Sequence, residues 1–526
     1  MNRRHFIQTA ALSGVAFALD CSSAFGADVE LEEATITGLQ AAMSSGKTSA
    51  LTLTRNYLSR IATLDRQGPK LNSVIQINPD AESIARELDR ERKKKGPRGP
   101  LHGIPVLIKD NINTHDRMPT SAGSLALEKS IAPQDAFIVE QLRAAGAVLL
   151  GKTNLSEWAN YRGYRSTSGW SSRGGQTHNP YCLDRNPSGS SSGSAAAVSA
   201  NFCTVAIGTE TDGSIVHPSS YNGIVGLKPT LGLISRSGII PIAHSQDTAG
   251  PMTRTVRDAA ILLGALTAQD SHDPATAVKA RKVHADYTQF LDAHGLRGAR
   301  IGVARKFFGR NRLADQILQK TIEAMKTAGA TIVDPADLPT HNKFGGAEGD
   351  ILNYEFKTDL NAYLATLGPN APVKSISDVI AFNNAHAHRV LPYFGQEEFL
   401  EAEQRGPLTE EKYLKALETA KRLAGAEGID AVMDKYQLDA LIAPTAGPAH
   451  VTDYIHGDRD TGGSSSPAAV AGYPNITVPA GFVHELPIGL SFFGRAWSEP
   501  VLLKLAYAFE QLTRARKPPR FLPTLP

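Results

Sequence analysis

The chain has 526 residues, of which 41% are hydrophobic and 20% are charged, which is the composition of a soluble globular protein with a large core. A disordered chain is therefore excluded. The formal net charge of +3, spread over 55 basic and 52 acidic residues, gives no long-range field to attract nucleic acid or anionic lipid. We expect no nucleic-acid partner.

The amino-terminal segment has the features of an export signal. Arg3 and Arg4 precede an apolar stretch over 10–19, and small residues follow near Gly26. This order is typical of a twin-arginine signal peptide, so we expect removal of residues 1–26 and a periplasmic or secreted protein. The apolar stretch is too short to span a bilayer as a helix, so no stable membrane anchor is expected.

The cysteines leave one alternative open at this end of the chain. Cys21 would be a lipidation site, but Asp20 precedes it where a lipid-attachment motif needs a small residue. Cys182 and Cys203 lie downstream of the expected cleavage site. Two cysteines in so long a chain do not make a disulfide framework.

Helical and extended patterns alternate after the signal. Residues 37–64 and 135–145 have apolar residues at helical spacing, and 104–108 and 147–150 are strand-like runs. This alternation predicts α/β packing. Residues 166–194 are rich in Gly, Ser, Asn and Pro, which predicts a functional loop that runs into a small-residue helix over 195–200.

The second half of the chain predicts further strands on both sides of a helical segment. Residues 338–428 are mostly helical and predict an insertion that covers the sheet. We expect helices at 256–266, 316–328 and 501–512, and strands at 301–304, 438–443, 475–479 and 488–493. Because sheet segments flank the insertion, residues 27–526 are predicted to form one α/β domain.

Three segments contain residues suited to nucleophilic chemistry. Lys109 directly follows an apolar run, 188–194 is a serine and glycine run, and Ser214 follows Asp212 and Gly213 at a predicted turn. A serine needs a base to act as a nucleophile, and a lysine can serve where burial keeps its amine neutral. Glycine permits a tight turn whose successive backbone N–H groups can bind an oxyanion. The third segment is the most specific, because a lysine at a strand end or a serine-rich loop alone is more often structural.

Together these segments resemble the amidase signature family. The match continues in the family's order through nearly all of residues 27–526, in the segments 99–105, 151–154, 226–230, 247–251 and 471–474. The resemblance implies an amidase signature fold with a large mixed β-sheet core covered on both faces by helices. It also implies hydrolysis of carboxamides by a Ser–cis-Ser–Lys triad that needs neither a metal nor an organic cofactor.

The resemblance also assigns a role to each candidate residue. Lys109 matches the family's lysine, Ser190 the serine that follows a cis peptide bond, and Ser214 the nucleophile. These roles imply that Ser214 forms an acyl-enzyme while protons pass along Lys109, Ser190 and Ser214. The implied oxyanion hole consists of the backbone N–H groups of Thr211, Asp212, Gly213 and Ser214.

Departures from the common family pattern narrow the expected substrate. Ser192 stands where glycine is usual, and Glu210 and Asp212 stand where Asp and then Gly are usual. With segments 158–160, 168–170 and 173–177, these departures are most similar to bacterial peptide amidases, which hydrolyse the C-terminal carboxamide of peptides. A peptide amide substrate is therefore expected, with aryl and fatty amides as alternatives. Near-neutral charge without a coiled-coil pattern is compatible with a monomer.

Two other kinds of site were weighed. Residues 189–193 fit the G-x-S-x-G elbow of α/β-hydrolases with Ser191 as nucleophile, but no strongly apolar strand precedes them. Two groups have residue types that bind metals, but their spacings match no established ligand pattern. They are His386 with His388, and His450 with Asp453, His456 and Asp458.

Two other kinds of protein were also weighed. A non-catalytic peptide-binding protein on the same scaffold would be expected to lack part of the triad, whereas Lys109, Ser190 and Ser214 are all present. The tRNA-linked amidotransferase subunit of the same family works in the cytoplasm, which disagrees with an export signal.

Overall fold

The computed structural model describes residues 30–526. The expected signal over 1–26 and Cys21 lie outside the described residues. Within the described part, none of the helices combines the length and the apolar character needed to cross a membrane.

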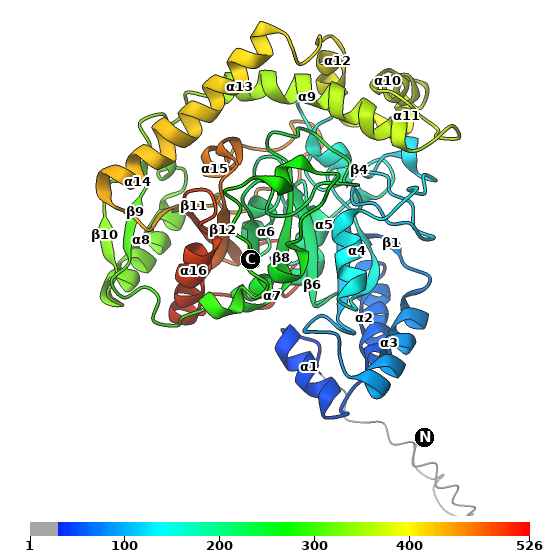
Figure 1. Ribbon diagram of the computed structural model, residues 1–526, viewed down its shortest axis with the longest axis horizontal. Helices are drawn as coiled ribbons and strands as arrows, with labels where there is room; N and C mark the ends of the chain where they lie inside the picture. Colours follow the sequence, from blue (N-terminus) through cyan, green and yellow to red (C-terminus); the bar gives the residue numbers. More distant parts are fainter. Residues whose placement is uncertain (1–29) are drawn as a thin grey trace, which may run out of the picture.

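Within residues 30–526, 11 strands form one mixed sheet in the order β1-β3-β2-β6-β8-β7-β12-β13-β11-β9-β10 (Figure 1). The strands are β1 (Val74–Ile77), β2 (Pro105–Lys109), β3 (Val148–Thr153), β6 (Val205–Glu210), β7 (Val225–Lys228), β8 (Thr248–Thr253), β9 (Arg300–Val303), β10 (Thr331–Val333), β11 (Ala440–Pro444), β12 (Asn475–Val483) and β13 (Leu486–Phe493). A separate two-stranded hairpin pairs β4 (Trp170–Ser171) with β5 (Gly175–Gln176). The predicted α/β fold with a large mixed sheet is confirmed.

Helices pack against this sheet along its length. The helices outside the insertion are α1 (Ile36–Ser44), α2 (Ala50–Arg60), α3 (Ala81–Lys95), α4 (Phe137–Ala144), α5 (Ser192–Ser199), α6 (Val216–Tyr221), α7 (Val256–Leu266), α8 (Arg312–Thr327), α14 (Ala431–Tyr436), α15 (Ser466–Ala471) and α16 (Glu499–Thr513). α5 packs on β2, β3 and β6, α7 on β7 and β8, and α8 and α16 on β12.

The strands that lead to the candidate residues lie in the middle of the sheet. β2 pairs in parallel with β3 and with β6, and β6 pairs antiparallel with β8. All five residues of β2 are buried, as expected for a central parallel strand with apolar residues facing both ways. Lys109 is the last residue of β2, so the strand extends one residue beyond the predicted run and carries the lysine inside.

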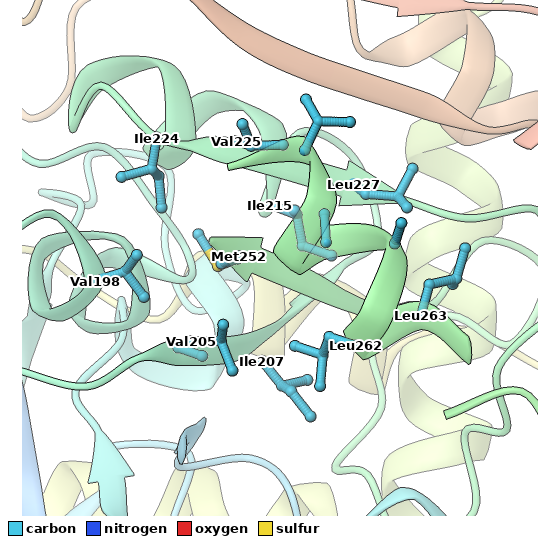
Figure 2. Close-up of a cluster of buried hydrophobic side chains, with 14 of the residues drawn as sticks. Val198, Val205, Ile207, Ile215, Ile224, Val225, Leu227, Met252, Leu262 and Leu263 are labelled. Atoms are coloured by element: carbon cyan, nitrogen blue, oxygen red, sulfur yellow. The ribbon is translucent and has the colours of Figure 1, made fainter. Parts of the chain in front are cut away.

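A dense apolar core supports the turn that carries Ser214. Ile215, directly after that serine, points into a cluster formed by side chains from α5, β6, β7, β8 and α7 (Figure 2). Fully burying an aliphatic side chain contributes about 1.5–3 kcal/mol to folding. The labelled members of the cluster are Val198, Val205, Ile207, Ile215, Ile224, Val225, Leu227, Met252, Leu262 and Leu263. The packing of Ile215 in this core thus fixes the position of the turn.

The helix after the serine-rich loop begins earlier than expected. The small-residue pattern predicts a helix over 195–200, whereas α5 spans Ser192–Ser199. Two serine hydroxyls explain the difference. Each donates to a backbone carbonyl, so these polar residues can be buried in the first turn of the helix. Ser192 Oγ donates to Ser188 O at 2.6 Å, and Ser194 Oγ donates to Ile207 O at 3.1 Å.

The predicted helical insertion lies between β10 and β11 and arches over one side of the molecule in Figure 1. It contains α9 (Gly345–Thr366), α10 (Ile376–Ala385), α11 (Ala387–Val390), α12 (Glu397–Glu403) and α13 (Glu411–Ala424). Phe356 and Leu360 of α9 form a core cluster with Trp158 and Ile240. These partners lie outside the strands, so α9 covers loops beside the candidate site.

Candidate active site

Lys109 is held at the end of β2 by three polar contacts. Its Nζ lies 2.8 Å from Ser190 Oγ, 2.8 Å from Thr209 Oγ1 and 3.2 Å from Thr209 O. Burial lowers the pKa of Lys109 to about 7, although the negative charges of Asp247 and Glu210 oppose that change. The amine is therefore available in its neutral form near neutral pH.

Ser190 lies in a loop whose position is fixed by a backbone hydrogen bond and by close packing at the preceding glycine. The peptide bond between Gly189 and Ser190 is cis, as the resemblance implied. Ser190 is fully buried, and its carbonyl accepts a hydrogen bond from Ser156 N at 3.1 Å. Gly189 has no room for a side chain, because a Cβ there would lie 2.2 Å from Ser156 Oγ. These contacts direct the Ser190 hydroxyl to the Lys109 amine.

Ser214 ends a turn that follows β6. Gly213 has a φ of +78°, which favours glycine, and Ile215 N and Val216 N donate to the Glu210 carboxylate at 2.7 and 3.0 Å. Within residues 30–526, the N–H groups of the turn donate no hydrogen bond to another residue. These free N–H groups belong to Thr211, Asp212, Gly213 and Ser214, the predicted oxyanion hole.

The two serine loops are joined through their backbones. Ser191 N donates to Ser214 O at 3.1 Å, which places Ser190 and Ser214 on neighbouring segments. In the part of the chain that the structure describes, no hydrogen bond links the Ser214 hydroxyl to Ser190. The structure therefore brings Lys109 into contact with Ser190, and it brings Ser214 beside them without that last contact. Catalytic hydrogen bonds in enzymes without substrate are often long and tighten on binding.

The comparisons with known proteins identify the family of this chain. The amidase family profile matches residues 52–503. The chain belongs to the amidase family. It is 42% identical to a probable amidase of Arabidopsis thaliana, over 94% of this chain and 92% of that protein. The family and its solved structures identify an amidohydrolase that acts on amides.

Two solved structures are more similar still. The native peptide amidase from Stenotrophomonas maltophilia is 54% identical, with a TM-score of 0.88, over 93% of this chain and 99% of that one. A peptide amidase in complex with the competitive inhibitor chymostatin is also 54% identical, with a TM-score of 0.90 over the same shares. The resemblance to peptide amidases extends over nearly all of this amidase.

Two residues near the lysine were not singled out by the sequence. Thr209 accepts hydrogen bonds from Lys109 and, at 3.0 Å, from Asn111 Nδ2. Asp247 accepts a hydrogen bond from Thr211 Oγ1 at 2.5 Å. This bond ties residues 211–214, called the oxyanion turn after their predicted role, to the loop before β8. Burial raises the pKa of Asp247 to about 6, although the hydrogen bond from Thr211 acts to lower that pKa. Both residues lie inside segments that match the family, and this match is the sequence feature that could have identified them.

The structure gives Ser191 a structural task. Its Oγ donates to Thr209 O at 3.0 Å and accepts from Thr209 N at 3.2 Å, so the hydroxyl links the loop to β6. These contacts disfavour an elbow nucleophile.

The histidine groups that were weighed as metal sites do not gather into ligand sets in the described residues. His456 pairs with Asp453 at 2.9 Å, while His450 lies 3.8 Å from Asp458. His386 caps its own helix through Phe382 O at 2.9 Å. A different trio, His244, Glu355 and Asp359, does converge, with its ligand atoms within 4.8 Å of one another. In this trio His244 pairs with the two carboxylates of α9, so the trio is an ionic contact between α9 and the loop before β8.

Two cavities flank the segment that leads from Thr209 to Ser214. One, of about 440 Å³, is bordered by Thr209 and Thr211 and has a largely apolar wall that includes Ile240. The other, of about 490 Å³, is bordered by His217, Glu348 and Ser465. Two of its lining side chains pack against the oxyanion turn, because a Cβ on Gly213 would lie 2.8 Å from His217 Nδ1 and 3.0 Å from Ser465 Oγ.

Proposed function

We propose that this amidase hydrolyses the C-terminal carboxamide of peptides through an acyl-enzyme on Ser214, with Lys109 as base and Ser190 as proton relay. The carrying observation is the environment of the Lys109 amine. Thr209 O can only accept, and Thr209 Oγ1 already receives a hydrogen bond from Asn111. A neutral amine that donates its two protons to these oxygens directs its lone pair toward Ser190 Oγ, 2.8 Å away.

The reaction then follows from this proton route. As Ser214 Oγ bonds to the amide carbon, its proton passes to Ser190, whose own proton moves to Lys109. The carbonyl oxygen becomes an anion and is held by the free N–H groups of 211–214. The C–N bond breaks as the leaving nitrogen takes a proton from Ser190, which Lys109 replenishes. Water repeats the route on the acyl-enzyme and releases the acid.

The substrate part of the proposal is supported by the relatives. The two peptide amidases match over 93% of this chain at 54% identity. A terminal carboxamide releases ammonia, which needs no binding pocket of its own. The peptide then occupies the acyl side of the site.

We also propose that the protein acts outside the cytoplasm as a monomer. The support for export is the order Arg3 and Arg4, an apolar stretch and small residues before position 27. Cell fractionation of the tagged full chain, with Arg3→Lys and Arg4→Lys together as the comparison, tests this. Retention of the double variant in the cytoplasm supports export, and equal fractionation contradicts it. Light scattering of the mature chain tests the monomer.

The substrate experiment measures ammonia release from a panel of amides, with Ser214→Ala as the background. Peptide amides, amino-acid amides, fatty amides and anilides form the panel, and anilides are followed by the released amine. We expect peptide amides to have the highest kcat/KM. A higher kcat/KM for fatty or aryl amides would contradict the substrate proposal while leaving the acyl-enzyme chemistry in place. Binding of peptide amides without turnover would instead indicate a non-catalytic peptide-binding protein.

A further inference from the structure

The polar cavity beside the oxyanion turn contains a histidine whose hydrogen bonding is incomplete. His217 is wedged between two glycines, since a Cβ on Gly213 would lie 2.8 Å from its Nδ1 and a Cβ on Gly463 would lie 2.7 Å from its Nε2. Its buried Nε2 has no hydrogen-bond partner within residues 30–526. A buried polar atom without a partner is unfavourable, so the binding of a ligand that supplies the partner is favoured.

Glu348 brings a second polar group to the same cavity from α9. Its Oε1 accepts from Gln246 Nε2 at 3.1 Å, and the same amide group reaches Thr211 O at 3.4 Å. Burial raises the pKa of Glu348 well above its usual value, and the adjacent Asp212 carboxyl adds to the effect. The raised pKa favours the neutral form of Glu348, whose carboxyl group can both donate and accept hydrogen bonds near the oxyanion turn.

The two cavities differ in the chemistry that their walls offer. Around the apolar cavity, Arg236 is already paired with Asp273, and Ile239, Ile240 and Ile242 provide much of the surface. Around the polar cavity, His217 and Glu348 present donors and acceptors, and Arg310 and Asp460 form an exposed pair 3.4 Å apart at its rim. A peptide backbone alternates N–H donors and C=O acceptors, whereas a fatty chain leaves such groups unsatisfied.

We propose that the polar cavity binds the peptide part of the substrate and that His217 Nε2 bonds to its backbone. This inference rests on the proposed function, which supplies the acyl-enzyme at Ser214. The cavity volume of about 490 Å³ is within the range of small-ligand sites. Two of its lining side chains, His217 and Ser465, pack against Gly213, next to the nucleophile, so a peptide bound there presents its terminal carboxamide to Ser214.

Helix α9 supplies a matched pair of positions for a test. Gly345 borders the polar cavity and Ala362 borders the apolar one. The two positions are about 26 Å apart along the helix, from 1.5 Å of rise per residue. Both residues are exposed, and a Cβ added to Gly345 meets nothing within 4 Å. Tryptophan at either position narrows one cavity without entering the core.

The experiment compares Gly345→Trp with Ala362→Trp on amides of one to four residues. We expect Gly345→Trp to raise KM for the tripeptide and tetrapeptide amides about tenfold with kcat nearly unchanged, because lost ground-state binding appears in KM. Ala362→Trp is expected to change KM less than about twofold. The reverse result, with only Ala362→Trp raising KM, would place the acyl group in the apolar cavity and overturn the inference.

His217→Ala tests the residue itself, with the exposed His294→Ala as its matched control. In the wild type we expect kcat/KM to rise with peptide length, and in His217→Ala we expect about a tenfold smaller rise. A wild type that hydrolyses amino-acid amides with no dependence on length, or a His217→Ala variant with an unaltered rise, would sink the inference and leave the amidase chemistry standing. Failure to release ammonia from any amide would sink the proposed function instead.

Discussion

Lys109 and Lys228 occupy equivalent places in the sheet, yet their surroundings differ. Each is the last residue of a central strand, β2 or β7, and each is fully buried. Burial lowers the pKa of Lys109 to about 7 and that of Lys228 to about 8. A buried lysine with a lowered pKa is therefore not in itself a sign of catalysis in this protein.

The neighbours of the two amines make the difference. Lys109 Nζ contacts the hydroxyls of Ser190 and Thr209, and the first of these can pass a proton onward. Lys228 Nζ donates to Pro229 O at 3.1 Å, and the carboxylates of Glu210 and Glu499 favour its charged form. Glu210 also accepts a hydrogen bond from the backbone after Ser214, so Lys228 supports the turn electrostatically. Lys109 instead contacts the serine hydroxyl of the proposed proton route.

The largest expected effect follows from removing the last hydroxyl of the proton route. Ser214→Ala should lower kcat/KM for a peptide amide by at least about 10⁴-fold, because no other group can form the acyl-enzyme. Ammonia release measures the loss, and circular dichroism checks that the fold is kept.

Ser191→Ala is the matched control for that loss. Because its hydroxyl bonds to the backbone of Thr209, we expect activity within about tenfold of wild type and a modest loss of stability, about 1 kcal/mol. If Ser191→Ala were inactive and Ser214→Ala active, the elbow interpretation would replace the proposed one.

A pair of lysine substitutions tests the comparison directly. Lys109→Met should lower kcat by about 10²–10⁴-fold, the usual contribution of a general base. Lys228→Met should keep kcat within about tenfold of wild type and lower the free energy of unfolding by about 1–3 kcal/mol, since buried polar partners lose a donor. Steady-state kinetics and thermal unfolding separate the two outcomes. Equal losses of kcat would show that the hydroxyl contacts do not distinguish the lysines.

The pH dependence of kcat/KM sharpens the assignment of the base. Lys109 must be neutral to accept a proton, so its pKa of about 7 predicts that kcat/KM falls about tenfold per pH unit on the acid side of neutrality. An acetylated peptide amide without ionisable groups isolates the enzyme's own titration. Because the Asp247 charge opposes the lowering of the Lys109 pKa, Asp247→Asn should move the acid limb to lower pH. A shift to higher pH would contradict this account.

The sequence pattern located some elements well and missed others for physical reasons. The predicted helix over 256–266 coincides with α7, because its apolar spacing is regular. β6 and β8 were not predicted. At Gly208, in β6, a side chain would not fit, because a Cβ there would be 2.6 Å from Met252 Sδ of the neighbouring strand β8. Pro251 lies within β8. Glycine and proline normally argue against a central strand, so close backbone packing overrode the local pattern.

The candidate site shows the same limit. Lys109, Ser190 and Ser214 were found by motif, since each stands in a segment with a recognisable neighbourhood. Asp247 also lies in a matched segment, but its contact with Thr211 joins residues 36 positions apart and depends on the pairing of β6 with β8. Residue identity can be read from a motif, whereas such a contact exists only once the sheet has formed.

His244 provides the opposite electrostatic case to the two lysines and the smallest expected effect. A hydrogen bond to Asp359 raises the pKa of this half-exposed histidine, and the charge of Glu355 adds to the increase. A raised folded pKa means that the contact stabilises fully below the unfolded value, about 6.5, and that this stability is lost as pH rises through the folded pKa. His244→Ala should therefore lower the melting temperature by about 1–2 °C at pH 5.5 and by less at pH 8.5, as for an exposed ion pair. Differential scanning fluorimetry at both pH values measures this, with His294→Ala as the surface control. An equal decrease at the two pH values would mean that His244 holds α9 by packing, and that neighbouring acids do not govern this contact as they govern Lys228.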